Sequence, residues 1–162
     1  MMKKSNRRTP ESIGVISDTH GLVRPEAVAA LRGCGLIIHA GDIGGQHVLD
    51  CFKSIARVIA VRGNNDAGEW ADILPETKVI DIDAVSIYVI HNVKELDLDA
   101  ASEGFGVVIS GHSHQPSIQR RDGVVFLNPG SAGPRRFRLP VSVARLRIRQ
   151  GKVEARLIEV SQ

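Results

Sequence analysis

The sequence predicts an α/β fold, in which two packed sheets are flanked by helices, and three observations support this prediction. Runs of four to six residues rich in Val and Ile recur along the chain, as in buried strands. The first three runs alternate with amphipathic segments, which indicates a largely parallel sheet with right-handed crossovers. From residue 117 the pattern is strand only, and its alternation of apolar and charged residues favours antiparallel pairs.

The amino-terminal half is expected to contain three strands joined by two helices. Proline suits the first turn of a helix and glycine its end, so the first helix begins at Pro25 and stops before Gly33. The second helix has an amphipathic pattern with one buried face. The expected strands are residues 13–17, 36–39 and 58–61, and the second helix is residues 46–54.

The carboxy-terminal half is expected to begin with a hairpin, because two apolar runs flank a tight turn that contains Asp. A short helix over residues 96–103 and a strand over residues 107–110 follow. The hairpin strands are residues 78–81 and 85–90, and the later antiparallel strands are residues 117–120, 124–127, 141–149 and 153–160.

The composition is that of a soluble globular protein, and the length allows one domain with a full core. Hydrophobic residues make up 43% of the 162 residues, and charged residues make up 24%. We expect a single domain over residues 11–162, preceded by a basic, disordered tail over residues 1–10. The tail holds four basic residues and no acidic one, whereas the remaining chain holds 17 basic and 18 acidic residues. The net charge of +3 therefore comes from the tail and does not by itself indicate nucleic-acid binding.

The cysteines and the apolar runs bear on cellular location. Cys34 and Cys51 are the only cysteines, and they do not form a Cys-x-x-Cys pair. No run approaches the ~18 apolar residues that span a membrane, and the first ten residues lack the apolar core of a secretory signal. We therefore expect a cytoplasmic protein with reduced thiols and no membrane contact.

Five of the apolar runs end in polar loops that carry residues able to ligate a metal. Strand ends at one edge of a sheet are where α/β folds gather binding groups, so these loops are expected to meet. The other two histidines are interpreted differently, His39 as a structural residue and His47 as a surface residue. The candidate metal ligands are Asp18, His20, Asp42, Asn64, His91, His112 and His114.

This ligand set is too large for one tetrahedral ion, which needs three or four protein ligands. It fits two ions about 3.5–4 Å apart, with the carboxylate of Asp42 able to bridge them. Such a pair clamps a phosphoryl group and lowers the pKa of a bridging water, and the resulting hydroxide attacks phosphorus in line. Mixed imidazole and oxygen ligands suit Mn²⁺, our first candidate, or Zn²⁺, Ni²⁺ or Fe, better than Ca²⁺.

The motifs, in their order along the chain, resemble the calcineurin-like metallophosphoesterase superfamily. They are Asp-x-His, Gly-Asp, Gly-Asn-x-Asp, a single His and Gly-His-x-His, and the resemblance spans residues 12–133. It implies an α/β/β/α sandwich with a partly parallel first sheet and antiparallel carboxy-terminal strands. The chain is similar in length to the small, single-domain phosphodiesterases of bacteria and archaea. The resemblance places Asp18, His20, Asp42 and His114 on one metal, and Asp42, Asn64, His91 and His112 on the other.

One position departs from the family pattern. The larger family enzymes have Gly-Asn-His-Asp, in which the His protonates the leaving oxygen or contacts the phosphate. This chain has Asn65 there, which cannot act as a general acid at neutral pH. We therefore predict faster turnover of activated aryl phosphodiesters than of alkyl phosphates. Catalytic roles are assigned to Asp42, Asn64 and Asp66, although Asp66, which orients that His in the relatives, is here left to hold the loop.

Two alternatives to an enzyme acting on small phosphate esters remain open. One is a non-catalytic scaffold protein, since the small subunit of the eukaryotic retromer is similar to the same branch; the complete ligand set favours the enzyme. The other is a nucleotide or nucleic-acid phosphodiesterase, in which Arg135, Arg136 and Arg138 would contact phosphate. A solvated basic face explains these three arginines equally well. A homo-oligomer is also open. The chain lacks the Gly-x-Ser-x-Gly elbow of a serine hydrolase.

Overall fold

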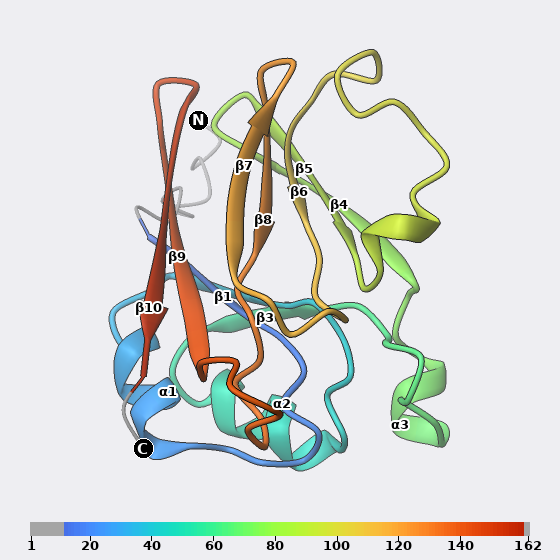
Figure 1. Ribbon diagram of the computed structural model, residues 1–162, viewed down its shortest axis with the longest axis vertical. Helices are drawn as coiled ribbons and strands as arrows, with labels where there is room; N and C mark the ends of the chain where they lie inside the picture. The colour runs from blue at the N-terminus through green and yellow to red at the C-terminus, as the bar shows by residue number, and fades with distance from the viewer. Residues whose placement is uncertain (1–11, 161–162) are drawn as a thin grey trace, which may run out of the picture.

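Two five-stranded sheets lie face to face in the computed structural model, which describes residues 12–160 (Figure 1). The first sheet has the order β10-β9-β1-β2-β3, and the second has the order β4-β5-β6-β8-β7. The predicted α/β fold of two sheets with flanking helices is therefore confirmed. The tail expected over residues 1–10 lies outside the described residues.

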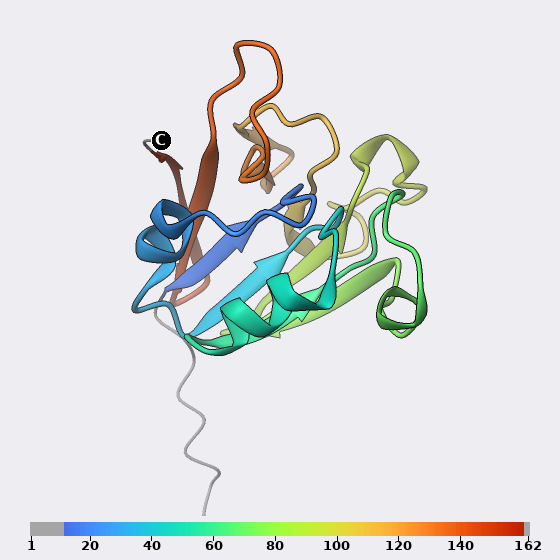
Figure 2. The same cartoon turned by 90° about the horizontal axis from the view of Figure 1, so that it is seen from below.

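The first sheet is built as the alternation of strands and helices predicted. β1 (Ile13–Ile16), β2 (Leu36–His39) and β3 (Arg57–Ala60) pair in parallel. Two antiparallel strands extend the sheet on the other side of β1, namely β9 (Ser142–Arg149) and β10 (Lys152–Glu159). The crossover helices α1 (Pro25–Leu31) and α2 (Gln46–Lys53) cover its outer face (Figure 2).

The second sheet contains the predicted hairpin and three further strands. β4 (Thr77–Ile82) and β5 (Val85–Ile90) are antiparallel across a turn at Asp83 and Ala84. β6 (Phe105–Ile109) lies parallel to both β5 and β8 (Val124–Asn128). β7 (Ser117–Arg121) forms the antiparallel edge next to β8.

Two apolar layers hold the strands of the first sheet in place. Successive residues of a strand point to opposite faces, so Val15 packs between the sheets while Ile16 packs towards the helices. Val15 meets residues of the second sheet such as Ile87 and Ile109, and Ile16 belongs to the cluster that includes Phe52 of α2. Because β1 is buried on both faces, its whole run is apolar, as in parallel strands generally.

The helix expected over residues 96–103 is wrong. A 3₁₀ turn, η1 (Val93–Glu95), is followed by irregular chain whose apolar residues cover the outer face of the second sheet. The side chain of Asp99 accepts hydrogen bonds from the backbone of Ala101 and Ser102, and such local bonds compete with helix formation. A short helix that the sequence analysis did not predict, α3 (Glu69–Asp72), follows the loop after β3.

Within residues 12–160, no helix is long and apolar enough to cross a membrane.

Candidate metal centre

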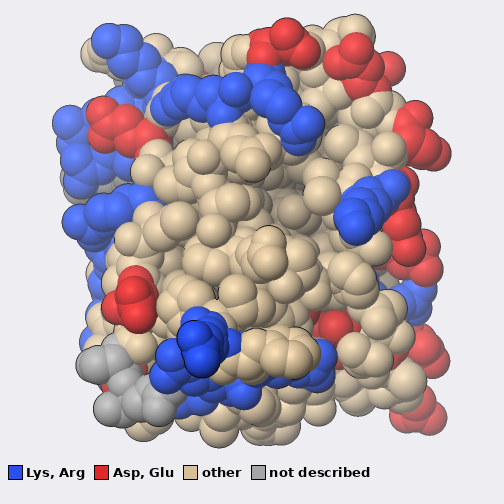
Figure 3. All heavy atoms as spheres, in the orientation of Figure 1, with Lys and Arg blue, Asp and Glu red and all other residues tan. Residues whose placement is uncertain are grey.

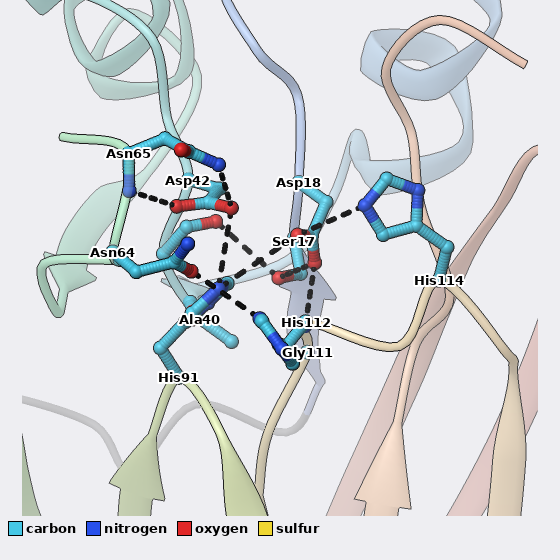
Figure 4. Close-up of polar contacts among 12 residues, drawn as sticks. Ser17, Asp18, Ala40, Asp42, Asn64, Asn65, His91, Gly111, His112 and His114 are labelled. Carbon is cyan, nitrogen blue, oxygen red and sulfur yellow. Dashed lines mark hydrogen bonds and ion pairs between the residues drawn. The ribbon is translucent and has the colours of Figure 1, made fainter. Parts of the chain in front are cut away.

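Loops that follow five strands meet at one edge of the two sheets. They follow β1, β2, β3, β5 and β6, and they direct carboxylate, amide and imidazole groups into the space between them (Figure 4). Two groups there have ligand atoms within 4.8 Å of one another, one made of Asp18, His20 and His114 and the other of Asp42, His91 and His112.

The first group is arranged around one oxygen of Asp18. Its Oδ1 lies 3.3 Å from Nε2 of His114 and 3.9 Å from Nε2 of His20. Asp18 and His20 come from one motif, Asp-x-His, and His114 from the loop after β6 completes the group. Asp18 and His114 are buried, and His20 is half-buried.

The second group is arranged around Asp42. Its Oδ2 lies 3.3 Å from Nε2 of His91, and Oδ1 of Asn64 lies 3.2 Å from Nδ1 of His112. The two groups are continuous, because Oδ2 of Asp42 is also 3.9 Å from Nε2 of His20 in the first group. The structure thus brings all seven predicted ligands together and puts Asp42 between the groups.

Several ligand atoms in the centre are buried without a hydrogen-bond partner. They are Oδ1 of Asp18, Nε2 of His20, Nε2 of His91 and Nδ1 of His114. Buried polar atoms are rarely left unpaired in folded proteins, since each costs about 1–3 kcal/mol. Three of them, Oδ1 of Asp18 and the Nε2 atoms of His20 and His91, lie close together in the centre, and oxygen and imidazole nitrogen atoms of this kind fit divalent cations and no apolar ligand.

The second oxygen of Asp18 is held by hydrogen bonds from two other residues. Oδ2 accepts the hydroxyl of Ser17 at 2.6 Å and the backbone amide of His112 at 3.0 Å. These contacts fix the carboxylate and leave Oδ1 facing the histidines. Ser17 therefore acts as a support for a ligand, which the sequence analysis did not predict.

Asp42 is oriented by Asn65. The backbone amide of Asn65 donates to Oδ1 at 2.9 Å, and its side-chain amide donates to Oδ2 at 3.0 Å. Burial alone would raise the pKa of Asp42, but the imidazole of His91, 3.3 Å from Oδ2, and the hydrogen bonds from Asn65 together hold it well below the usual range of a carboxyl. These neighbours favour the charged form of Asp42, which is the form that can bind a metal.

Asp66 joins the loop of Asp42 to the loop of Asn64. Its carboxylate accepts backbone N–H groups of Ile43, Gly44 and Gly63 at 2.9–3.2 Å. None of these contacts involves a ligand side chain. They give Asp66 a positioning role for the two loops.

A backbone hydrogen bond fixes the orientation of His91. Its Nδ1 lies 2.8 Å from the carbonyl of Ala40, so Nδ1 carries the proton and Nε2 presents a lone pair to the centre. Burial alone would lower the pKa of His91, but the neighbouring carboxylates of Asp42 and Asp18 raise it. The pKa of His114 is lowered by burial and by the nearby charges of Arg136 and His20, against the opposing charge of Asp18.

His39 and His47 stand outside the ligand groups, as the sequence analysis interpreted them. Nδ1 of His39 accepts the backbone amide of Gly41 at 3.1 Å, and its Nε2 donates to Oγ1 of Thr19 at 3.0 Å. Burial, with the charge of His91, lowers the pKa of His39 from 6.5 to about 3, so its ring is neutral. His47 is exposed and hydrogen-bonds the carbonyl of Gly21.

Backbone strain is concentrated at the ligands. Five of them adopt the left-handed conformation, with φ between 47° and 70°, which is rare for residues other than glycine but tolerated by Asp and His. They are Asp18, His20, Asp42, His112 and His114. No spacing rule in the sequence signals this conformation.

The glycine before a ligand is needed for close approach of the loops. A Cβ atom on Gly111 would lie 2.0 Å from Oγ of Ser17 and 2.5 Å from Oδ2 of Asp18. A Cβ atom on Gly63 would lie 2.2 Å from Oδ1 of Asp42. The repeated Gly-ligand pairs in the sequence were a signal of this packing.

The loop between β8 and β9 lies against the first ligand group. Oγ of Ser131 donates to the carbonyl of Asp18 at 3.0 Å. Further along, Arg135, Arg136 and Arg138 are exposed, and Arg136 is near enough to affect the pKa of His114. The arginine cluster therefore lies on the side of the centre that holds Asp18 and His114.

A two-sheet α/β sandwich whose loops gather Asp, Asn and His around one space is the architecture of a metal-dependent hydrolase. Comparison with known proteins agrees. The calcineurin-like phosphoesterase superfamily domain matches residues 12–151. The chain belongs to this superfamily, and is by family a metallophosphoesterase.

Individual relatives give the same result. The chain is 37% identical, over 93% of its length and 82% of the relative's, to a probable metallophosphoesterase of Methanocaldococcus jannaschii. It is 31% identical, over 73% of its length and 82% of the relative's, to a phosphodiesterase of the same organism. The structure of vacuolar protein sorting 29 from Cryptosporidium parvum has the same fold, with a TM-score of 0.74 at 19% identity over 96% of this chain and all of that one.

Proposed function

We propose that the protein is a phosphodiesterase that works with two divalent cations, Mn²⁺ being the first candidate. The observation that carries the proposal is the pair of connected ligand groups, in which Oδ1 of Asp18 and the Nε2 atoms of His20 and His91 are buried and have no hydrogen-bond partner. One cation would be held by Asp18, His20, Asp42 and His114, and the other by Asp42, Asn64, His91 and His112. A phosphodiesterase at 31% identity supports the diester as the substrate class.

The surrounding residues fit this chemistry. Two bound cations supply charge neutralisation at the phosphoryl oxygens and an activated water for in-line attack. Ser17 and Asn65 orient the two carboxylates, and the hydrogen bond to Ala40 orients His91. Asn65 has no acidic proton to give to a leaving oxygen at neutral pH, so good leaving groups are favoured.

A non-catalytic scaffold protein could have the same fold, but it would not need a complete set of metal ligands. The chain resembles vacuolar protein sorting 29 in structure, and that likeness concerns the fold alone. A scaffold has no reason to maintain four unpaired polar atoms or five strained ligand residues. These costs favour the enzyme.

A nucleotide or nucleic-acid ester is the second candidate substrate, because of the exposed loop that carries Arg135, Arg136 and Arg138. Phe137 in this loop is 93% exposed, and arginines with an exposed aromatic ring suit a phosphate with an attached base. Salt-sensitive binding of DNA or RNA that survives deletion of residues 1–10 would support this candidate.

The deciding experiment combines metal analysis with hydrolysis of bis(p-nitrophenyl) phosphate across Mn²⁺, Zn²⁺, Ni²⁺ and Fe²⁺. We expect two bound ions per chain and metal-dependent hydrolysis, which Asp42→Asn abolishes. Asp122→Asn, an exposed position in the β7–β8 turn, is the matched control and should retain activity. Two bound metals with equal inactivity of wild type and Asp42→Asn would support the scaffold instead.

The cytoplasmic location proposed from the sequence accords with Cys34 and Cys51, which are both free thiols in the structure.

A further inference from the structure

A cleft of about 660 Å³ opens beside the second ligand group. Three ligand residues form one end of it, namely Asn64, His91 and His112. Its volume is within the range of sites that bind small molecules. Because the cleft starts at the metal centre, a group attached to a phosphorus atom there would extend into it.

The walls of the cleft carry an excess of negative charge. Glu76, Glu95 and Asp97 line it, against the single guanidinium of Arg62. Arg62 is already paired with Glu76 at 3.0 Å. Among residues 12–160, neither Glu95 nor Asp97 has an ion-pair partner, so two carboxylates remain to attract a cation.

An aromatic ring completes the lining. Tyr88 is half-buried and lines the cleft, and its ring packs against that of Phe105 at 67°, with 5.2 Å between the ring centroids. A fixed aromatic ring beside carboxylates is a favourable environment for an ammonium group, through cation–π attraction and charge.

A buried polar atom without a hydrogen-bond partner lies among the lining residues of the cleft. The side chain of His91 is only 6% exposed, and its Nε2 has no hydrogen-bond partner. The exposed carboxylates of the walls therefore adjoin a buried position at which a phosphate ester bound to the metal centre would be held.

The opposite side of the centre has the opposite charge. Figure 3 shows mostly acidic side chains, with a few basic ones between them, along the edge that carries η1 and α3, and basic side chains along the edge that carries the loop between β8 and β9. A continuous polyanion that crosses the centre would have to enter the acidic cleft, which is electrostatically unfavourable. A diester with one cationic or uncharged alcohol meets no such barrier.

We infer that this cleft is a specificity subsite for one ester group, and that it selects phosphodiesters in which that alcohol carries a quaternary or primary ammonium group. The inference rests on the proposed phosphodiesterase function. Glu95 and Asp97 attract the cation, and Tyr88 supplies an aromatic ring in the lining beside them. None of these three residues is a metal ligand.

The test compares two substrates with the same leaving group, p-nitrophenyl phosphocholine and bis(p-nitrophenyl) phosphate. The double variant Glu95→Gln/Asp97→Asn should lower the ratio of their kcat/KM values about fivefold at low salt, mainly through KM of the choline ester. The matched control, Glu69→Gln/Asp72→Asn, removes two exposed charges from α3 outside the cleft and should leave the ratio unchanged. An unchanged ratio in the cleft variant, or an equal fall in the control, overturns the inference.

A second readout separates this inference from the proposed function. Tyr88 is the only tyrosine in the sequence, so its ring signals in the NMR spectrum report on the cleft alone. Choline chloride should shift these signals in wild type and not in Glu95→Gln/Asp97→Asn. Shifts without any hydrolysis would refute the phosphodiesterase and retain the cation subsite, whereas hydrolysis of bis(p-nitrophenyl) phosphate without shifts or choline preference would refute the subsite alone.

Discussion

The side-chain amide of Asn65 donates a hydrogen bond to Oδ2 of Asp42 over 3.0 Å. The residue that replaces the family's histidine therefore points at the carboxylate that lies between the two ligand groups (Figure 4). It supports Asp42 from the position where the resemblance places a general acid in larger relatives. Asn65 thus orients Asp42 but has no acidic proton to give to a leaving oxygen.

Replacement of Asn65 by histidine should restore acid catalysis. General acid catalysis contributes about 10²–10⁴-fold, and most to poor leaving groups, so Asn65→His should raise turnover of alkyl phosphodiesters at least about tenfold. Activated p-nitrophenyl esters should change little. The measurement is the dependence of kcat on leaving-group pKa across a series of aryl and alkyl esters.

Asn65→Ala controls for loss of the hydrogen bond to Asp42, since it removes the amide and adds no acid. This variant should lower the turnover of all substrates by a similar factor. A leaving-group dependence in Asn65→His equal to that of wild type would contradict the explanation.

Substitution of Asp66 by asparagine should weaken metal binding without touching a ligand. An amide at this position turns an N–H donor towards the backbone donors of Ile43, Gly44 and Gly63. We expect about 1–3 kcal/mol of lost stability and metal affinity lower by about 10–100-fold. Calorimetric titration with Mn²⁺ measures the metal affinity, and urea unfolding measures the stability. Asp122→Asn is the reference variant. Equal Mn²⁺ affinities of wild type and Asp66→Asn would contradict the positioning role.

The sequence was sufficient for the strands and for a set of candidate ligands that lie together in the structure. Apolar runs such as that of β1 report burial on both faces, and a strand must deliver its following loop to the sheet edge. The motifs then named the seven ligands that the structure brings together. At these positions the local motif and the strand topology both place the residue at the same edge of the sheets.

The sequence was insufficient where packing outweighs local pattern. Residues 96–103 have helical composition, but Asp99 bonds its own backbone and the segment lies across the second sheet as irregular chain. The amides of Asn65 reach the carboxylate of Asp42, 23 residues away in the sequence, only because the two loops meet. The acidic cleft likewise combines residues from β4, β5 and η1, whose proximity no motif records.

Substitution of Gly111 by alanine should disturb the first ligand group by steric conflict alone. The added methyl would lie 2.0 Å from Oγ of Ser17 and 2.5 Å from Oδ2 of Asp18, so these groups must move. Overpacking of this kind costs about 1–3 kcal/mol, and displacement of Asp18 should reduce bound metal. Elemental analysis after dialysis against Mn²⁺ measures the loss.

Gly123→Ala is the control for Gly111→Ala, because Gly123 has open space but a positive φ of 79°. It should lose about 1 kcal/mol of stability from backbone strain and keep both metals. Full metal occupancy in Gly111→Ala would show that the loops tolerate the methyl group.

The neutral ring of His39 predicts that the metal-free protein loses stability in mild acid. Its pKa is about 3 in the folded state against 6.5 in the unfolded state, so the unfolded chain takes up the proton first as the pH falls. The stabilisation is complete above pH 6.5 and declines between pH 6.5 and about 3, at about 1.4 kcal/mol per pH unit for this one group. Urea unfolding in EDTA at pH 7, 6 and 5 measures how steeply the free energy of unfolding falls as the pH is lowered.

Two histidine variants test whether His39 is the group responsible. His39→Asn retains an acceptor for the amide of Gly41 and should reduce the pH dependence by about 1.4 kcal/mol per pH unit. His47→Gln, at the exposed histidine, should leave the pH dependence unchanged. Equal pH dependence in wild type and His39→Asn would show that His39 is not the group responsible.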